Sequence, residues 1–195
     1  MNIEVSENLL FSTPVWKGSV TQVNNNSIKE YCLEVRNKKP GVIISNRGGW
    51  HSKELILPIP KDLENLFDNL TSLVNQINHN YFKISELKLG NWWININGSY
   101  DYNMPHDHQK SIISGAYYVS VPEENMGNLV LHRGDVAEYF LPGSAQNNPT
   151  SINRIAVNLP VEESMFYIFP SWVKHSVERN ESNNERISIA FNFVI

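Results

Sequence analysis

The chain has 195 residues, of which 41% are hydrophobic, and its formal net charge is −4. A chain of this size can bury a sizeable core, and we expect one domain over residues 1–195. Acidic and basic residues are interspersed, so no basic stripe is available to hold a nucleic-acid backbone. No apolar run approaches the roughly 18 residues needed to span a bilayer. Residues 1–5 also lack the basic and apolar segments of a signal peptide. Neither nucleic acid nor a membrane is therefore an expected partner.

The only cysteine of the sequence is Cys32, which excludes an internal disulfide. This composition fits a reducing compartment, and we predict a cytoplasmic protein. Cys32 lies on the apolar stripe of a predicted helix, so we interpret it as a core residue and not as a nucleophile.

The first ninety residues predict a scaffold that contains two helices. A short strand is expected around residues 9–11, and Thr13-Pro14 then turns the chain into Val15-Trp16. Apolar residues recur at helical spacing between Ser27 and Arg36, and Asn26 or Ser27 can cap this helix. The basic residues that follow, 36–39, are interpreted as a solvated turn with no partner. A second apolar stripe from Asp62 to His79 predicts a helix that packs on the back of a sheet.

Between the two helices lies the segment 45–52, which contains Gly48-Gly49-Trp50-His51. Two glycines permit an unusual backbone path, so the Trp and His side chains could turn toward a pocket. An ordinary turn with Trp50 in the core is an equal alternative. His51 alone is more typical of a hydrogen-bonded or surface histidine than of a ligand.

The second half of the chain reads as strands. Trp92, Ile94 and Ile96 alternate with Trp93, Asn95 and Asn97, which predicts a strand with one polar face. Further strands are expected over residues 112–121, 128–132, 154–159, 164–169 and 187–195. The polar stretch 137–151 is expected to be a loop at a rim or a lid. Short strands after two helices predict a mainly β, α+β fold: a β-sandwich or jelly roll buttressed by the two N-terminal helices.

Three histidines form a candidate metal site. His106 and His108 are two residues apart and would project from the same face of a strand, at its entrance after Pro105. His175 is expected on a distant aromatic-rich strand and could complete the site. Imidazole suits iron, zinc, copper or nickel. His79 and His132 are expected to have structural or surface roles.

The intervening acid, Asp107, leaves the ligand set open. The common iron site uses two histidines and one carboxylate, but Asp107 lies one residue too early to share a face with both histidines. Either His106, His108 and His175 form the site, or a bulge turns Asp107 inward in place of His108. A third alternative has two histidines with water in place of the acid. Simple alternation favours three histidines.

Arg186 and Ser188 form a candidate anion site on another predicted strand. A guanidinium can hold a carboxylate through two parallel hydrogen bonds, and a nearby hydroxyl can add a donor. A surface salt bridge beside Glu185 is the simpler interpretation of an arginine here. The apolar strand that Arg186 opens looks buried, however, and a buried arginine needs an anionic partner.

Taken together, these motifs resemble the small 2-oxoglutarate/Fe(II)-dependent oxygenases found in phages and marine bacteria, which belong to the double-stranded β-helix superfamily, with its cupin-like jelly roll. The resemblance covers most of the chain. Its pieces are residues 11–16, 45–52, 105–108, 114–119, 169–172 with His175, and 186–188 with Phe191-Asn192. The departure is at position 108, where this chain has histidine in place of the superfamily's usual acid.

The resemblance implies an activity and a set of roles. Fe(II) would be held by His106, His108 and His175, and the distal carboxylate of 2-oxoglutarate by Arg186 and Ser188. O2 would be consumed with release of succinate and CO2, and an unidentified substrate would be hydroxylated. Asn97 or Asn95, and Tyr117 or Tyr118, are expected to add pocket donors, although only one tyrosine of the pair can point inward. The sequence leaves the oligomeric state open, a homodimer included.

Two other functions fit parts of the pattern. A cupin-like metal enzyme without 2-oxoglutarate could use the same three histidines. A non-catalytic jelly-roll module, such as a virion or carbohydrate-binding protein, would bind no iron in fixed proportion and form no succinate.

Overall fold

The computed structural model describes residues 4, 6, 10–53 and 58–195, in which two antiparallel sheets face each other. The six-stranded sheet has the order β1-β9-β6-β11-β4-β3 and the five-stranded sheet the order β2-β5-β10-β7-β8. The strands are β1 Trp16–Ser19, β2 Asn46–Arg47, β3 Trp50–His51, β4 Lys88–Asn97, β5 Tyr102–His106, β6 Ile113–Ser120, β7 Leu129–His132, β8 Ala156–Leu159, β9 Met165–Pro170, β10 His175–Val177 and β11 Arg186–Val194. This is the expected jelly-roll arrangement, a double-stranded β-helix.

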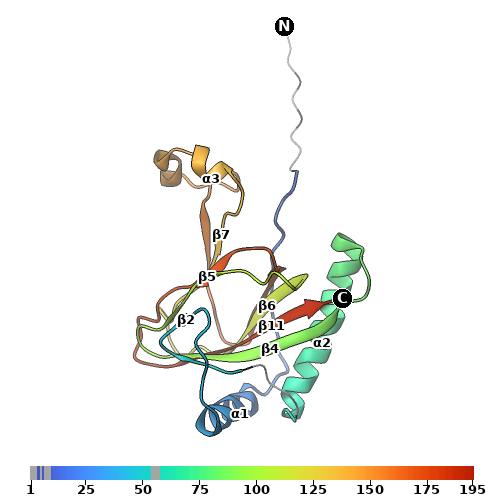
Figure 1. Ribbon diagram of the computed structural model, residues 1–195, viewed down its shortest axis with the longest axis vertical. Helices are drawn as coiled ribbons and strands as arrows, with labels where there is room; N and C mark the ends of the chain where they lie inside the picture. Colours follow the sequence, from blue (N-terminus) through green and yellow to red (C-terminus); the bar gives the residue numbers. More distant parts are fainter. Residues whose placement is uncertain (1–3, 5, 7–9, 54–57) are drawn as a thin grey trace.

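Two helices cover the outer face of the larger sheet, as the sequence predicts (Figure 1). Helix α1 spans Asn25–Lys38 and α2 spans Lys61–Ile77, followed by a π-helical turn over Asn78–Phe82. The apolar stripe of α2 packs against the sheet, where the ring of Phe67 lies 4.9 Å from that of Trp92. Cys32 of α1 is completely buried in the same core, and burial raises the pKa of its thiol to about 12. The core role predicted for Cys32 is therefore confirmed.

Several local predictions needed correction. Asn24, and not Asn26 or Ser27, caps α1, accepting a hydrogen bond from the backbone N–H of Ser27. Residues 36–38 of the predicted basic turn belong to the last turn of α1, and they do have a partner, because Arg36 donates to Glu185 at 2.5 Å. Phe11 is fully exposed and neither it nor Leu10 lies in a strand, whereas Leu9 lies outside the described residues. Leu10 and Phe11 precede β1, the first strand in the described part of the chain, which begins at Trp16 and pairs with β9 at the edge of the larger sheet.

The segment 45–52 carries the chain from one sheet to the other. Strand β2 pairs with β5 in the smaller sheet and β3 pairs with β4 in the larger. The turn between them needs positive φ at both glycines, 69° at Gly48 and 64° at Gly49, which favours glycine. A Cβ at Gly48 would also lie only 1.9 Å from a carboxylate oxygen of Asp101. Trp50 packs against the core, as the simpler alternative predicted.

The stretch predicted as a rim loop contains two short helices. Helix α3 spans Ala137–Phe140 and a 3-10 helix spans Gly143–Asn147, both between β7 and β8. Figure 1 shows this excursion extending away from the sheets. No helix in the described part of the chain is long and apolar enough to cross a membrane.

Candidate metal centre and its cavity

The three predicted histidines converge at one point. His106 is the last residue of β5 and His175 the first of β10, and the two are direct partners across these antiparallel strands. Their ring centroids lie 4.3 Å apart, and His108 lies 5.2 Å from His106 and 5.0 Å from His175. One ring nitrogen from each can be chosen so that all three lie within 4.8 Å of one another.

The strands that carry the cluster differ from the predicted ones. His106 ends β5 and does not open a strand, so the pair is at a strand exit and His108 lies just beyond it. His175 opens a short strand of its own, separated by a turn from the aromatic-rich β9. His108 is held in place because its backbone N–H donates to the carbonyl of Ser171 in that turn, at 3.1 Å.

Hydrogen bonds fix which ring nitrogens face the cluster. The Nδ1 of His106 lies 2.7 Å from the carbonyl oxygen of Met104, and the Nδ1 of His175 lies 2.9 Å from that of Val173. A carbonyl accepts, so each Nδ1 carries the proton and donates. Each Nε2 is left with a free lone pair, which is the form that binds a metal.

All three histidines are neutral at physiological pH. Burial, reinforced by the nearby His106, lowers the pKa of His175 to about 3 and that of His108 to about 4. Burial also lowers the pKa of His106. Because a metal binds only the deprotonated ring, these shifts keep the donors ready without competition from protons.

Asp107 does not belong to the cluster. The group of potential ligands contains His106, His108 and His175, and Asp107 neither joins it nor lines the adjoining cavity. The structure therefore agrees with the alternative of three histidines, although Asp107 and His108 lie beyond the end of β5 and strand alternation does not place them.

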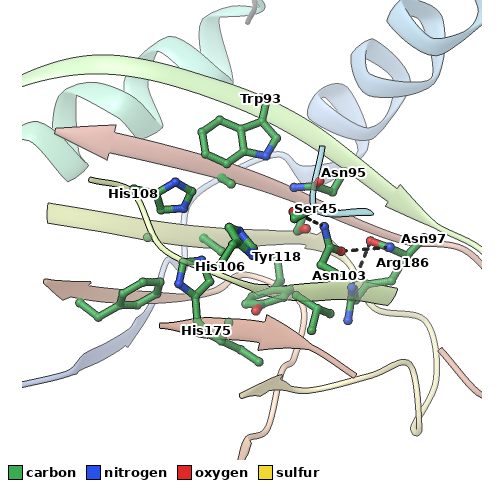
Figure 2. Close-up of a pocket in the computed structure, with 17 residues that line it drawn as sticks. Ser45, Trp93, Asn95, Asn97, Asn103, His106, His108, Tyr118, His175 and Arg186 are labelled. Atoms are coloured by element: carbon green, nitrogen blue, oxygen red, sulfur yellow. Dashed lines mark hydrogen bonds between the residues drawn. The ribbon is translucent and has the colours of Figure 1, made fainter. Parts of the chain in front are cut away.

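A cavity between the two sheets runs from the histidine cluster to Arg186 (Figure 2). Four strands of the larger sheet (β4, β6, β9 and β11) and three of the smaller (β5, β7 and β10) contribute to its wall. Within the described part of the chain its lining contains no carboxylate, and consists of Ser45, Trp93, Asn95, Asn97, Asn103, His106, His108, Gly115, Ala116, Tyr118, Leu129, Phe169, His175, Val177, Arg186, Ser188 and Ala190.

Arg186 is the buried cation at the far end of this cavity, only 1% exposed. Its Nη1 donates to the carbonyls of Met126, at 2.9 Å, and Gly127, and its Nη2 donates to Oδ1 of Asn97 at 3.1 Å. These acceptors are all neutral, and Nε has no partner in the described residues. Burial lowers the pKa of Arg186, yet a guanidinium stays charged.

The surroundings of Arg186 suit an anionic ligand. A buried charge without a counter-ion is costly, and an unused N–H donor adds to that cost. Ser188 lies on the same strand face two residues from Arg186 and also lines the cavity. An acceptor-rich anion at this end would therefore satisfy both the charge and the free donor.

The pocket tyrosine is Tyr118 and not Tyr117. Tyr117 points to the opposite face of β6, where it is buried under the helices and its hydroxyl donates to Asn25 at 2.7 Å. Tyr118 lines the cavity, and burial raises the pKa of its phenol. The two faces of a strand alternate, so only one of the neighbours can reach the site. The placement of Tyr117 in the pocket was wrong.

Both candidate asparagines line the cavity, as the polar face of β4 predicted. Asn97 accepts from Arg186 and donates to Asn103, which donates to Ser45 in turn. Asn103, in the short polar strand β5, and Ser45, just before β2, are lining residues that the sequence did not single out as pocket donors.

Trp93 is the other residue whose role the sequence did not reveal. Its indole lies 5.4 Å from the ring of His108 and stacks on His51 at 5.7 Å with an interplanar angle of 12°. The Nδ1 of His51 bonds to the carbonyl of Ser52 at 2.6 Å, so His51 is a hydrogen-bonded support, as predicted. His132 bonds to Ser176 and His79 is exposed, and neither joins the cluster.

Comparison with known proteins agrees with this geometry. Three solved structures share the fold over nearly the whole chain. A prolyl-4-hydroxylase from Pseudomonas putida is 12% identical, with a TM-score of 0.65 over 95% of this chain and 94% of that one. A viral collagen prolyl hydroxylase from Paramecium Bursaria Chlorella virus-1, in complex with 2-oxoglutarate, is 10% identical, with a TM-score of 0.63 over 93% and 96%. HygX from Streptomyces hygroscopicus, with nickel and 2-oxoglutarate bound, is 10% identical, with a TM-score of 0.57 over 93% and 82%.

At these identities the structures show a shared fold and no more. The search of curated protein sequences gave no match. A family model described as "Putative 2OG-Fe(II) oxygenase" matches residues 91–192, just over half of the chain, including all three histidines and Arg186. The chain therefore belongs to the 2-oxoglutarate/Fe(II) oxygenase family, whose members use Fe(II) and 2-oxoglutarate.

Proposed function

We propose that this protein is an Fe(II)- and 2-oxoglutarate-dependent oxygenase that hydroxylates a substrate still to be identified. The observation that carries the proposal is the pairing, in one cavity, of three neutral imidazoles with a buried guanidinium that has no counter-ion among the residues the structure describes. In this family, bound Fe(II) and 2-oxoglutarate supply an oxidant from O2, with release of succinate and CO2.

His106, His108 and His175 would hold the iron through the ring nitrogens that face one another. The carbonyls of Met104 and Val173 keep two of these rings in the required tautomer and orientation. A three-coordinate protein site leaves positions open for small ligands, which oxygenase chemistry requires.

Arg186 and Ser188 would bind the distal carboxylate of 2-oxoglutarate. Asn97 and the carbonyls of Met126 and Gly127 orient the guanidinium, which leaves Nε–H for the ligand. The cavity lies between the two sheets, where the effective dielectric constant is lower than in water, so each of these polar contacts is stronger than it would be at the surface.

An anaerobic titration tests the proposal. Addition of Fe(II) and then 2-oxoglutarate should produce the weak visible charge-transfer band of their complex. Arg186→Ala should raise the 2-oxoglutarate concentration required by about a hundredfold or more, because a buried charge-assisted contact is lost, while iron binding survives. An unchanged 2-oxoglutarate requirement would favour a cupin-like metal enzyme. Absence of iron binding in this titration, together with absence of succinate after O2 is admitted, would favour a non-catalytic module.

A further inference from the structure

Asn95 occupies the middle of the cavity wall. The cavity face of β4 carries Trp93, Asn95 and Asn97 in alternation (Figure 2). Trp93 lies against His108, and Asn97 is bonded to Arg186. Because a strand rises about 3.3 Å per residue, Asn95 lies roughly 7 Å along the strand from each of these neighbours. It is therefore between the metal end and the anion end.

The side chain of Asn95 is unused by the scaffold. Its Oδ1 is buried and has no hydrogen-bond partner among the described residues. Figure 2 likewise shows no hydrogen bond from Asn95 to any residue drawn. The neighbouring buried amides are all engaged: Asn97 with Arg186, Asn103 with Ser45, and Asn192 with Asn91. Asn95 as a whole is partly buried, but a buried amide oxygen without a partner is destabilising, and it persists in a binding site where a ligand completes it.

The chemistry of the amide identifies the kind of ligand. All the oxygens of 2-oxoglutarate are acceptors at neutral pH, so this molecule alone cannot satisfy an acceptor such as Oδ1. An amide side chain presents one acceptor and a donor group side by side, and a half-turn of the group only exchanges them. Its complement is a group with a donor and an acceptor at the same spacing, and a peptide-type amide is such a group.

We propose that Asn95 is a specificity-determining residue that pairs with an amide group of the primary substrate. The inference rests on the proposed function, because it concerns the same cavity. Trp93, held in place by its stacking on His51, provides a flat apolar wall beside this amide. The substrate class is therefore a molecule that carries a secondary or primary amide near the carbon to be hydroxylated.

The test uses the full chain loaded with Zn(II), which is diamagnetic and does not activate O2, and 2-oxoglutarate. The probe is N-acetylglycine N-methylamide, and the side-chain amide signal of Asn95 is followed by 1H–15N NMR. We expect this signal to shift on addition of the probe. Asn95→Ala should raise the Kd of the probe about tenfold, since paired hydrogen bonds are lost, and should leave the Kd of 2-oxoglutarate unchanged. Methyl acetoxyacetate, a diester in which oxygen replaces both N–H groups of the probe, should bind several times more weakly than the amide.

The controls separate this inference from the proposed function. Binding of 2-oxoglutarate to the unsubstituted protein reports on the function alone, whereas the amide-to-ester difference reports on Asn95. Asn65→Ala, an exposed asparagine of α2, should change neither affinity. Asn95→Ser replaces the alanine variant if that variant does not fold.

Three outcomes would overturn the inference. One is equal binding of amide and ester. The second is a loss of 2-oxoglutarate affinity in Asn95→Ala with probe binding unaffected, which would assign Asn95 to the co-substrate. The third is an Asn95 signal that does not move up to the solubility limit of the probe, which would indicate that water alone completes the amide.

Discussion

The neutrality of the groups around Arg186 leads to a sharp prediction for Asn97→Asp. Asn97 accepts from the guanidinium at 3.1 Å, and both residues are almost fully buried. Aspartate has nearly the same shape as asparagine but would give Arg186 an internal counter-ion. Asn103 can accommodate the change, because its amide can turn so that Nδ2 donates to the new carboxylate. Its Oδ1 then accepts from the Ser45 hydroxyl.

The expected loss can be worked out from this geometry. Two carboxylates on one guanidinium lie on the order of 5 Å apart, and at an effective dielectric constant of about 20 their repulsion is about 3 kcal/mol. That energy corresponds to a weakening of 2-oxoglutarate binding by about a hundredfold. Asn97→Ser removes the acceptor without adding charge, so it should cost only about 1 kcal/mol, or less than tenfold.

The assay is an anaerobic titration of the Fe(II)-loaded variants with 2-oxoglutarate, followed through the visible band. Iron affinity and thermal stability should be retained in Asn97→Asp, because the histidine cluster is at the other end of the cavity and the new carboxylate pairs with a buried cation. If Asn97→Asp binds 2-oxoglutarate as tightly as the unsubstituted protein, Arg186 is not the anchor. If Asn97→Ser is as damaged as Asn97→Asp, geometry and not charge governs the site.

Three further predictions follow from the site and its surroundings. His108→Ala should weaken Fe(II) binding much more than Asp107→Ala in a metal titration; the reverse order would favour a carboxylate ligand. The metal-free protein should lose about 4 kcal/mol of unfolding free energy between pH 7.5 and pH 5. The pKa values of His108 and His175 lie near 4 and 3 in the folded chain but near 6.5 when unfolded, so the unfolded state alone takes up the two protons. Urea denaturation in the presence of a chelator measures this loss, and a flat profile from pH 7.5 to 5 would contradict it. Zn(II) in place of the chelator should raise the unfolding free energy at pH 7.5. The variant His79→Gln, at an exposed position, is the control and should show the same loss as the unsubstituted protein. Tyr117→Phe should lower the unfolding free energy by about 1 kcal/mol through loss of the bond to Asn25 and leave 2-oxoglutarate affinity unchanged, whereas a large affinity loss would return Tyr117 to the pocket.

Much of the fold follows from periodicity in the sequence. The apolar stripe of α2 and the alternation of β4 predict these elements clearly, because each element buries an apolar face and has polar residues on the opposite face. All the strands expected after residue 110 are present, with ends within about two residues of the expected bounds. The convergence of the three histidines was also predicted correctly, since the chemistry of imidazole restricts the interpretation of such a pattern.

The features that the sequence did not reveal depend on tertiary contacts. Strands β5 and β10 are short and polar, and they are held by pairing with each other, which no local pattern reports. Arg36 and Glu185 are 149 positions apart, so their ion pair could not be read from either segment. The choice between Tyr117 and Tyr118 depends on which face of β6 meets the helices. Because β6 is buried on both faces, its sequence has no alternation of polar and apolar residues that would distinguish them.

The charge balance of the cavity connects the metal end to the anion end. Three histidines bring no negative charge, and no carboxylate is found among the described residues that line the cavity. A divalent ion and Arg186 would therefore leave three positive charges, which a dianionic co-substrate reduces to one, whereas an acidic ligand in place of His108 would leave none. The residual charge favours anions in the remaining metal positions. His108→Asp should accordingly retain the metal but weaken competitive inhibition by small anions such as azide. Equal inhibition of the two proteins, measured at matched metal occupancy, would show that the third imidazole does not set the charge of the site.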